Sequence, residues 1–229
     1  MTDGPAIVTI WSDIGCPWAH RAVHRLHETR ARLGLAERIR FAHRPFPLEL
    51  FNDKPTPKDV LDPEMAVLSA HDPEPGWRPW SAPDWQWPVT TLLAMEAVQA
   101  AAEQSVAAAE QLDRRLRRAF FAESRCISLR HVILEAAAGC EAVDTGALEA
   151  ALDAGWARAE VMRSFRKADA SDAINGSPHV FLPDGTDAHN PGIRMHWEAK
   201  DTPQRRPVID ADDPSVYDEL LRRAAAVAA

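Results

Sequence analysis

The sequence contains no apolar run that approaches the ~18 residues needed to span a bilayer, and its 34 acidic residues outnumber its 26 basic ones. The resulting net charge of −8 argues against nucleic-acid binding, which needs a basic surface. The first residues show no basic segment followed by an apolar one, so we expect no secretory signal. Three widely spaced cysteines fit a reducing compartment better than a disulfide-rich secreted fold. We therefore expect a cytoplasmic protein that binds neither membrane nor nucleic acid.

Metal-site spacings and internal repeats are also missing from the sequence. No arrangement of Cys and His residues is typical of a zinc site, and no segment repeats itself. The chain does have a hydrophobic fraction of 46% over 229 residues, which is enough for a packed core in one large or two small domains.

The first fifty residues predict a β-α-β unit. Ile7 to Trp11 form an apolar run of strand length, and Pro17 to about Leu33 carry apolar residues at helical spacing. Gly34 is typical of the position just after a helix. A second strand follows from Ile39 to Phe46. Because strand-helix-strand connections are right-handed crossovers, the two strands are expected to be parallel.

Cys16 stands immediately before the proline that begins this helix. Proline favours the first helical position because the amide hydrogen that it lacks would have no partner there. The sulfur of Cys16 would then face free backbone N–H groups and the positive end of the helix dipole. Such a position predicts a lowered pKa, rapid alkylation at neutral pH and a nucleophilic thiolate. The alternative is a cysteine that is simply buried as a small apolar residue.

A redox motif of the Cys-x-x-Cys type would have a second cysteine where this chain has Ala19. Cys16 therefore has no resolving partner in the motif. His20 lies one helical turn along, where it either stabilises the thiolate or acts as an acid or base, or only covers the helix surface. Cys126 and Cys140 are expected to be packing residues rather than resolving thiols.

Residues 51 to 87 are rich in proline and show no periodic pattern, so we expect no long regular element there. Four of the eight tryptophans fall in this segment: Trp77, Trp80, Trp85 and Trp87. They either pin a proline-stiffened loop to the body of the protein or form an aromatic wall over the Cys16 pocket, since ligand sites favour aromatic linings.

Helices are predicted in the next part of the chain. Thr90 to Ala102 is rich in alanine, and Ser105 either caps or interrupts a continuation to Phe120. Ser128 is a predicted N-cap of a helix that Gly139 stops, and Asp144 is the N-cap of another. That last helix carries one apolar stripe: Leu148, Leu152, Trp156 and Ala159.

Four arginines lie close together on the predicted helix that ends near Phe120: Arg114, Arg115, Arg117 and Arg118. We expect them to form mostly a solvated face. An anion site is the alternative.

Strand-like sequence returns near residue 175. Asn175 to Leu182 combine a turn, a proline and a short apolar strand, and residues 183–186 form a tight turn before a returning strand. Residues 191–213 are polar and interrupted by prolines, with Trp197 as the main apolar anchor. A last amphipathic helix begins at Pro214.

This order of elements resembles the DsbA family of thioredoxin-fold proteins. The resemblance rests on the strand followed by Cys16-Pro17, the helical insertion, and Gly-Ser-Pro-His-Val-Phe before a hairpin and a terminal helix. It covers about residues 6–190, and the FrnE-like branch is the most similar, with 2-hydroxychromene-2-carboxylate isomerases and kappa-class glutathione transferases also related. The implied fold is α/β and thioredoxin-like, with residues 1–50 and 170–229 in one domain and residues 51–169 in an all-helical insertion.

The resemblance also implies a site. Pro178 would be cis and lie beside the sulfur of Cys16, and the backbone of Ser177 would pair with a thiol-bearing substrate as an added strand does. An ordinary trans proline at the start of a strand is the alternative. His179 is adjacent, although its position on a strand would direct its ring elsewhere. The implied substrate-binding set is Pro17, Trp18, Ser177, Pro178 and His179, and the implied catalytic pair is Cys16 and His20.

Ala19 decides which chemistry can be carried over from the family. A dithiol oxidant passes on its internal disulfide, and no such disulfide can form in this motif. Cys16 alone can attack a disulfide and form a mixed disulfide, which external glutathione, mycothiol or a protein thiol would resolve. We therefore predict a monothiol thiol-disulfide oxidoreductase, acting as an isomerase or reductase on small or protein substrates, without a tightly bound cofactor. A homodimer is compatible with this prediction.

Two other hypotheses stay open. In the isomerase and transferase relatives the helix start holds glutathione, a serine commonly stands at the position of Cys16, and the substrate is a small aromatic or electrophilic molecule. The third hypothesis is a scaffold that kept the fold and lost the activity.

Overall fold

The central sheet of the protein has four strands in the order β2-β1-β3-β4. The computed structural model describes residues 4–199, 202 and 204–227. Strand β1 (Ala6–Ser12) runs parallel to β2 (Ile39–Pro45) and antiparallel to β3 (His179–Phe181), which pairs in turn with β4 (Asp187–His189). The predicted β-α-β start and the later hairpin are both confirmed.

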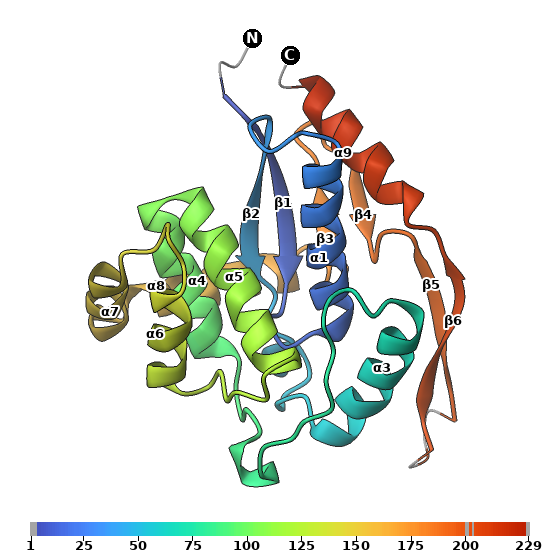
Figure 1. The fold of residues 1–229 in the computed structure, drawn as a ribbon, viewed down its shortest axis with the longest axis horizontal. Coiled ribbons are helices and arrows are strands. Elements are labelled where there is room, and N and C mark those ends of the chain that lie inside the picture. Colours follow the sequence, from blue (N-terminus) through green and yellow to red (C-terminus); the bar gives the residue numbers. More distant parts are fainter. Residues whose placement is uncertain (1–3, 200–201, 203, 228–229) are drawn as a thin grey trace.

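Helices α1 (Pro17–Arg32) and α9 (Ser215–Val227) pack together and cover one face of this sheet, as Figure 1 shows. Alternate residues of β1 face these helices, so Val8 and Ile10 are fully buried. They belong to one apolar cluster with Leu26 of α1 and Leu221 of α9. The burial of this cluster holds α1 and α9 against β1.

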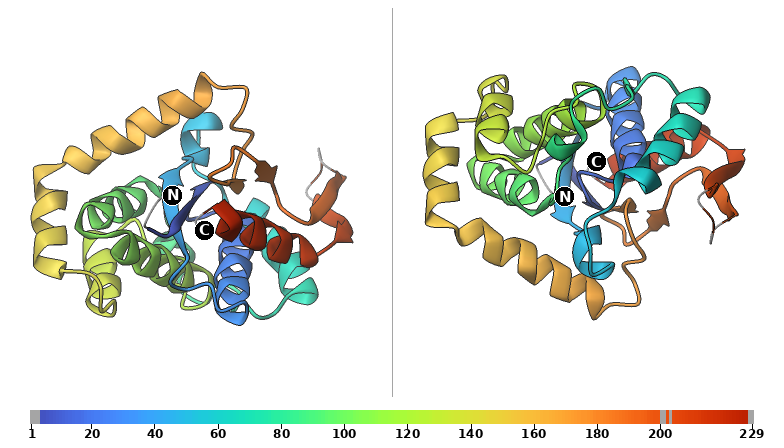
Figure 2. Two further views of the ribbon diagram at one scale, coloured as in Figure 1. Left: turned by 90° about the horizontal axis from the view of Figure 1, so that it is seen from above. Right: turned by 90° about the horizontal axis from the view of Figure 1, so that it is seen from below.

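The helical insertion contacts the sheet through β2. Its helices are α4 (Leu92–Gln104), α5 (Val106–Phe121), α6 (Arg130–Ala138), α7 (Thr145–Ala154) and α8 (Trp156–Asp169). Figure 2 shows α7 and α8 wrapped around the pair α4 and α5. These helices have an apolar cluster of their own, in which alanines let α4 and α5 approach closely. The division into domains at residues 50 and 170 stays a prediction.

The predicted N-cap Asp144 is confirmed, and Ser105, which could either cap or interrupt a helix, is the N-cap of α5. The side chains of Ser105 and Asp144 each accept a hydrogen bond from a backbone N–H three residues on. The predicted N-cap Ser128 is wrong, because Leu129 is the N-cap of α6. The Ser128 hydroxyl instead donates to the carbonyl of Thr90 at 2.6 Å, which ties α6 to the loop before α4.

The predicted stripe from Leu148 to Ala159 does not lie on one helix. Gly155 has a left-handed backbone with a φ of 69°, and it separates α7 from α8. Trp156 begins the new helix and is 41% exposed. The glycine was the signal for this break, since a helix commonly ends at such a residue.

The expectation that residues 51–87 hold no long regular element is wrong. The short helix α2 (Leu48–Phe51) ends where the segment begins, and η1 (Asp84–Gln86) lies near its end. Between them is the 14-residue helix α3 (Lys58–His71), with Pro63 inside it. Burial of apolar side chains at helical spacing offsets the backbone hydrogen bond that this proline lacks. Those side chains are Leu61, Met65 and Leu68.

Residues 191–213 contain a hairpin that was not predicted. Strand β5 (Ile193–Glu198) pairs antiparallel with β6 (Arg206–Asp212), and half-buried residues alternate with exposed ones along β5. The strict alternation of apolar and polar residues from Ile193 to Glu198 was the available signal. Figure 1 shows the hairpin beside α3, which β6 contacts.

Ion pairs attach α3 and this hairpin to α1. Asp72 follows α3 and accepts hydrogen bonds from the side chains of Arg21, at 3.1 Å, and Arg25, at 2.7 Å. The same two arginines pair with Asp212 at the end of β6. Arg21 is only 1% exposed, so its guanidinium is buried within this ion-pair cluster. Among the described residues, no helix has the length and apolar character that crossing a membrane requires.

The two isoleucines of β1 provide a matched test of the sheet core. Replacing the fully buried Ile10 with alanine should lower the free energy of unfolding by about 2–5 kcal/mol, through lost burial and a cavity. Ile7 is 41% exposed on the same strand, so Ile7→Ala should cost at most about 1 kcal/mol. Urea unfolding of the two variants measures both values, and equal losses would contradict this packing.

Candidate active site

Cys16 lies at the point where the two segments of the implied site meet. It is the N-cap residue of α1, and Pro17 occupies the first helical turn as predicted. The Cys16 thiol donates a hydrogen bond to the carbonyl oxygen of Ser177 at 3.2 Å. The peptide bond between Ser177 and Pro178 is cis, which confirms that prediction.

Asp13 organises the loop between β1 and α1, and sequence reasoning missed it. Its backbone N–H donates to the Ser177 hydroxyl at 2.9 Å. Its buried carboxylate accepts hydrogen bonds from the N–H groups of Gly15, at 2.7 Å, and Leu48, at 2.8 Å, and from the hydroxyl of Thr91, at 3.2 Å. The Asp13 carboxylate therefore stabilises the turn at Gly15 and connects the loop that carries the cysteine to Leu48 and Thr91.

Arg117 of α5 reaches the same loop from the helical insertion. Its guanidinium donates to the carbonyl of Asp13 at 3.0 Å and to the hydroxyl of Ser12 at 2.8 Å. It also forms an ion pair with Asp113 at 2.7 Å. Arg117 is 1% exposed, so the expectation of a solvated arginine face is wrong for this residue.

The predicted low pKa of Cys16 is wrong. The residue is 3% exposed, and burial raises the pKa of its thiol to about 12. The hydrogen bond to Ser177 and the N–H of Ala19 lower the pKa, whereas the charges of Glu64 and Asp13 raise it. The increase in pKa caused by burial is larger than the decrease expected from the N-terminus of the helix, so the resting thiol is protonated.

Trp18 connects the motif to a second buried carboxyl group. Its indole N–H donates to Oε1 of Glu64 on α3 at 2.9 Å. Burial raises the pKa of Glu64 to about 7 and that of Asp13 to about 6. Both carboxyl groups have raised pKa values, and the charge of each raises the pKa of the Cys16 thiol. Glu64 was missed because its helix was not predicted.

His20 packs as an apolar side chain does. Its ring stacks on Phe121, with centroids 4.5 Å apart, and meets the edge of Trp77 at 4.7 Å. Nε2 donates to the carbonyl of Pro75 at 3.2 Å. Burial lowers the pKa of His20 to about 3, so its ring is neutral and provides no positive charge to stabilise a thiolate. This favours the interpretation in which His20 covers the helix.

His179 holds the hairpin together. Its Nδ1 accepts a hydrogen bond from the N–H of Asn175 at 3.0 Å, and its Nε2 donates to Asp187 at 2.8 Å. The ring is completely buried and packs against Phe181. Both ring nitrogens are thus engaged by the protein, which leaves no free polar group for a substrate.

The tryptophans mainly pin the segment after α3 to the helical core. Trp77, Trp80 and Trp87 pack against that core, and Trp85 is 81% exposed. Trp87 also lines a cavity of about 20 Å³ beside Asp13, which has room for roughly one water. These tryptophans therefore do not form an aromatic wall over Cys16, and the alternative of a loop pinned to the body of the protein holds.

The other two cysteines belong to the helical insertion and are not disulfide-bonded. Cys140 is buried and donates to the carbonyl of Ala136 at 3.4 Å, as a packing residue does. Cys126 is half-buried.

Burial of the thiol predicts slow alkylation. In a Cys126→Ser/Cys140→Ser background, Cys16 of the folded protein should react with iodoacetamide at least tenfold more slowly than in urea at about pH 7.5, because few thiolates form. Mass spectrometry of timed samples measures both rates. Equal rates would mean that the thiol is exposed and ionised.

Replacing Glu64 with glutamine should stabilise the protein above pH 7. Burial raises the pKa of Glu64 from 4.5 to about 7, so the folded state binds this proton more tightly than the unfolded state, and wild-type stability falls as pH rises through that window. Glutamine keeps the acceptor for Trp18 without the charge. Urea unfolding at about pH 8 should show a gain on the order of 2–3 kcal/mol that shrinks toward about pH 4.5. Glu103→Gln, at an exposed position of α4, is the control and should show no such gain.

Known structures share this fold over nearly the whole chain. The cytosolic disulfide reductase DsbM from Pseudomonas aeruginosa matches with a TM-score of 0.60 and 14% identity, covering 96% of this chain and 99% of that one. A "probable DsbA oxidoreductase" from Streptomyces coelicolor matches with a TM-score of 0.60 and 21% identity, covering 96% and 89%. A 2-hydroxychromene-2-carboxylate isomerase matches with a TM-score of 0.56 and 17% identity, covering 80% and 87%.

These identities show the shared fold alone. No curated protein matches the sequence. The model of the DSBA-like thioredoxin domain, however, matches residues 7–204. That match agrees with the strand order, the helical insertion and the cis bond before Pro178. The chain therefore belongs to the family of DSBA-like thioredoxin domains.

Proposed function

We propose that this protein catalyses thiol-disulfide exchange through a single mixed disulfide at Cys16. The observation that carries the proposal is the 3.2 Å hydrogen bond from the Cys16 thiol to Ser177, the residue before the cis bond. Ala19, which is fully buried, stands where a second sulfur of the motif would be. The site thus has the attacking group and the substrate-facing loop of the family, without a resolving thiol in the motif.

Two exchange steps make up the proposed reaction. The Cys16 thiolate attacks one sulfur of a disulfide RSSR, the new bond joins Cys16 to SR, and RS⁻ leaves. An external thiolate then attacks the mixed disulfide, and Cys16 leaves as a thiolate. Electrons and atoms balance at each step, and the net result is reduction or rearrangement of the substrate disulfide at the expense of the external thiol.

The backbone of Ser177 provides the place for the substrate. Its carbonyl holds the resting thiol, and its N–H makes no hydrogen bond with other described residues. A disulfide-bearing segment that pairs with these groups as an added strand would bring its sulfur beside Cys16. Pro17 and Trp18 lie next to Cys16 at the helix start and would complete the contact surface.

The Cys16 proton must leave before the attack. Glu64 and Asp13 are both close enough for their charges to raise the pKa of the thiol. Burial raises the pKa of Glu64 to about 7, which suits a group that accepts a proton near neutral pH. Glu64, which Trp18 holds, and Asp13 are therefore the two candidate acceptors of this proton.

Glutathione or mycothiol is the proposed external thiol, and the cytosol is the proposed compartment. The P. aeruginosa reductase of similar fold is described as cytosolic and was also solved with glutathione. A low-molecular-weight thiol present in excess would resolve the mixed disulfide without a second cysteine in the protein.

The protonated thiol favours one alternative, a thiol-dependent isomerase or transferase. A neutral Cys16 thiol can donate a hydrogen bond to the sulfur of a bound cofactor. In this role Cys16 polarises a thiol that it never attacks. The isomerase of similar fold makes this the second candidate.

Oxidised glutathione discriminates between the two functions. In the Cys126→Ser/Cys140→Ser background, incubation near pH 8 should give one glutathione adduct on Cys16 by intact mass, reversed by added thiol. The further change Ala19→Cys should abolish the stable adduct, because the new thiol displaces glutathione and leaves an internal disulfide.

Cys16→Ser in the same background is the control and should carry no adduct. Non-covalent binding of reduced glutathione without any adduct would instead support the isomerase or transferase. A chain that neither forms the adduct nor binds the thiol would be a scaffold.

A further inference from the structure

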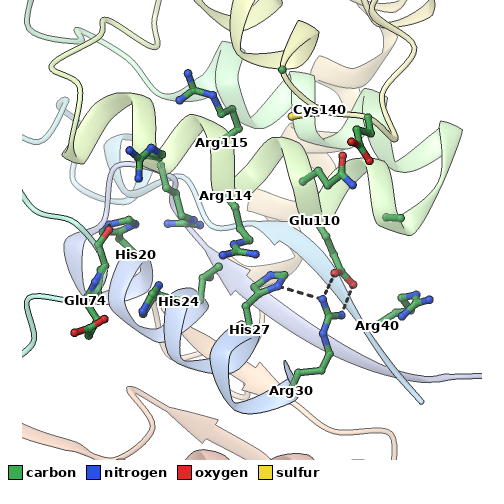
Figure 3. Close-up of a pocket in the computed structure, with 18 residues that line it drawn as sticks. His20, His24, His27, Arg30, Arg40, Glu74, Glu110, Arg114, Arg115 and Cys140 are labelled. Atoms are coloured by element: carbon green, nitrogen blue, oxygen red, sulfur yellow. Dashed lines mark hydrogen bonds and ion pairs between the residues drawn. The ribbon is translucent and has the colours of Figure 1, made fainter. Parts of the chain in front are cut away.

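A cavity of about 730 Å³ lies between α1 and α5, away from the proposed chemistry. Its walls are one side of α1 from His20 to Arg30 and the facing side of α5 from Ala107 to Arg118 (Figure 3). Cys16, Ser177 and Pro178 do not line it. This volume is within the ~300–1,000 Å³ range of small-molecule sites and far exceeds what one phosphate or carboxylate fills.

The lining of this cavity is basic, although the chain has a net charge of −8. It includes six arginines and three glutamates. Of the glutamates, Glu110 is already engaged by Arg30 and by the N–H of Phe41, while Glu74 and Glu141 are exposed. The inner surface therefore has an excess of cationic donors.

Several of these cations are incompletely neutralised by the protein. Arg115 and Arg118 share a single carboxylate, that of Glu123, at 2.9 and 3.1 Å. The side chain of Arg114 makes no hydrogen bond with the described residues, and its ion-pair partner, the exposed Glu28, is 3.9 Å away. Arg114, Arg115 and Arg118 therefore carry more positive charge than their carboxylate partners neutralise, and all three line the cavity.

The histidines of α1 provide a second, independent observation. His27 is 6% exposed, and its Nε2 is buried without a hydrogen-bond partner among the described residues. Buried polar atoms of this kind are rare in proteins and commonly mark a missing ligand or water. Figure 3 shows the guanidinium of Arg114 reaching from α5 toward the rings of His24 and His27.

We infer that this cavity binds a small polyanion, a molecule with two or more carboxylate or phosphate groups. Arg114 would hold one anionic group in its planar fork, with His24 and His27 as donors from the opposite helix. Arg115 and Arg118 would hold a second group along α5. This site is separate from the thiol chemistry and does not depend on it.

Calorimetric titration with tripolyphosphate and with citrate at low ionic strength tests the inference. At least one of them should bind with a stoichiometry of one, and Arg114→Gln should weaken that binding at least tenfold. The control is Arg163→Gln, which removes an exposed arginine of α8 that pairs with Glu160 outside the cavity. This change should alter the binding less than twofold. His24→Gln should weaken the binding as well.

Three results would overturn the proposal. They are the absence of binding by both probes, equal weakening by the two arginine variants, and binding by Arg114→Gln at wild-type affinity. Thermal unfolding checks that the variants are folded. Arg114→Gln should unfold near the wild-type temperature, because the Arg114 side chain is half-exposed and makes no hydrogen bond with the described residues. Cys16→Ser should bind the probes as wild type does, which separates this site from the proposed exchange reaction.

Discussion

The buried guanidinium of Arg117 joins the two parts of the molecule at the site. It leaves α5, pairs with Asp113 on its own helix, and donates to Ser12 and Asp13 at the end of β1. Removing one partner of such a pair leaves an uncompensated buried charge, which costs about 3–5 kcal/mol. The loop that carries Cys16 is therefore held by the helical insertion as much as by its own strand, and neither part positions the thiol alone.

Regular local patterns made much of the fold predictable. The apolar run before Cys16, the proline after it and Gly34 fixed the first β-α unit, and Asn175 to Leu182 gave the second half of the sheet. Helix α3 was missed because Pro63 is a local signal against helix, whereas the burial of Leu61 and Met65 is a tertiary effect. The hairpin of β5 and β6, by contrast, had a clear alternating pattern.

The sequence predicted the cysteine and the cis-proline segment of the site, but it predicted neither the supporting residues Asp13 and Glu64 nor the pKa of the thiol. The cis bond before Pro178 and its place beside Cys16 followed from the family resemblance, whereas the hydrogen bond from Cys16 to Ser177 was not predicted. The direction of the shift in the Cys16 pKa depended on how completely the folded chain buries the thiol, which no local pattern encodes. No local pattern encodes the effect of Glu64 either. It lies 48 positions from Cys16 in the sequence, yet its charge raises the pKa of the thiol.

Ala19 has a consequence for how Cys16 would respond to a thiol pool. When oxidised glutathione oxidises a protein with two cysteines in the motif, an internal disulfide forms and two molecules of reduced glutathione are released. The oxidised fraction of such a protein therefore depends on the square of the concentration of reduced glutathione. With alanine at this position, one molecule is released for each mixed disulfide on the proposed chemistry. The fraction of Cys16 that carries glutathione then depends only on the ratio of oxidised to reduced glutathione. Concentrating or diluting the pool at a constant ratio would leave it unchanged.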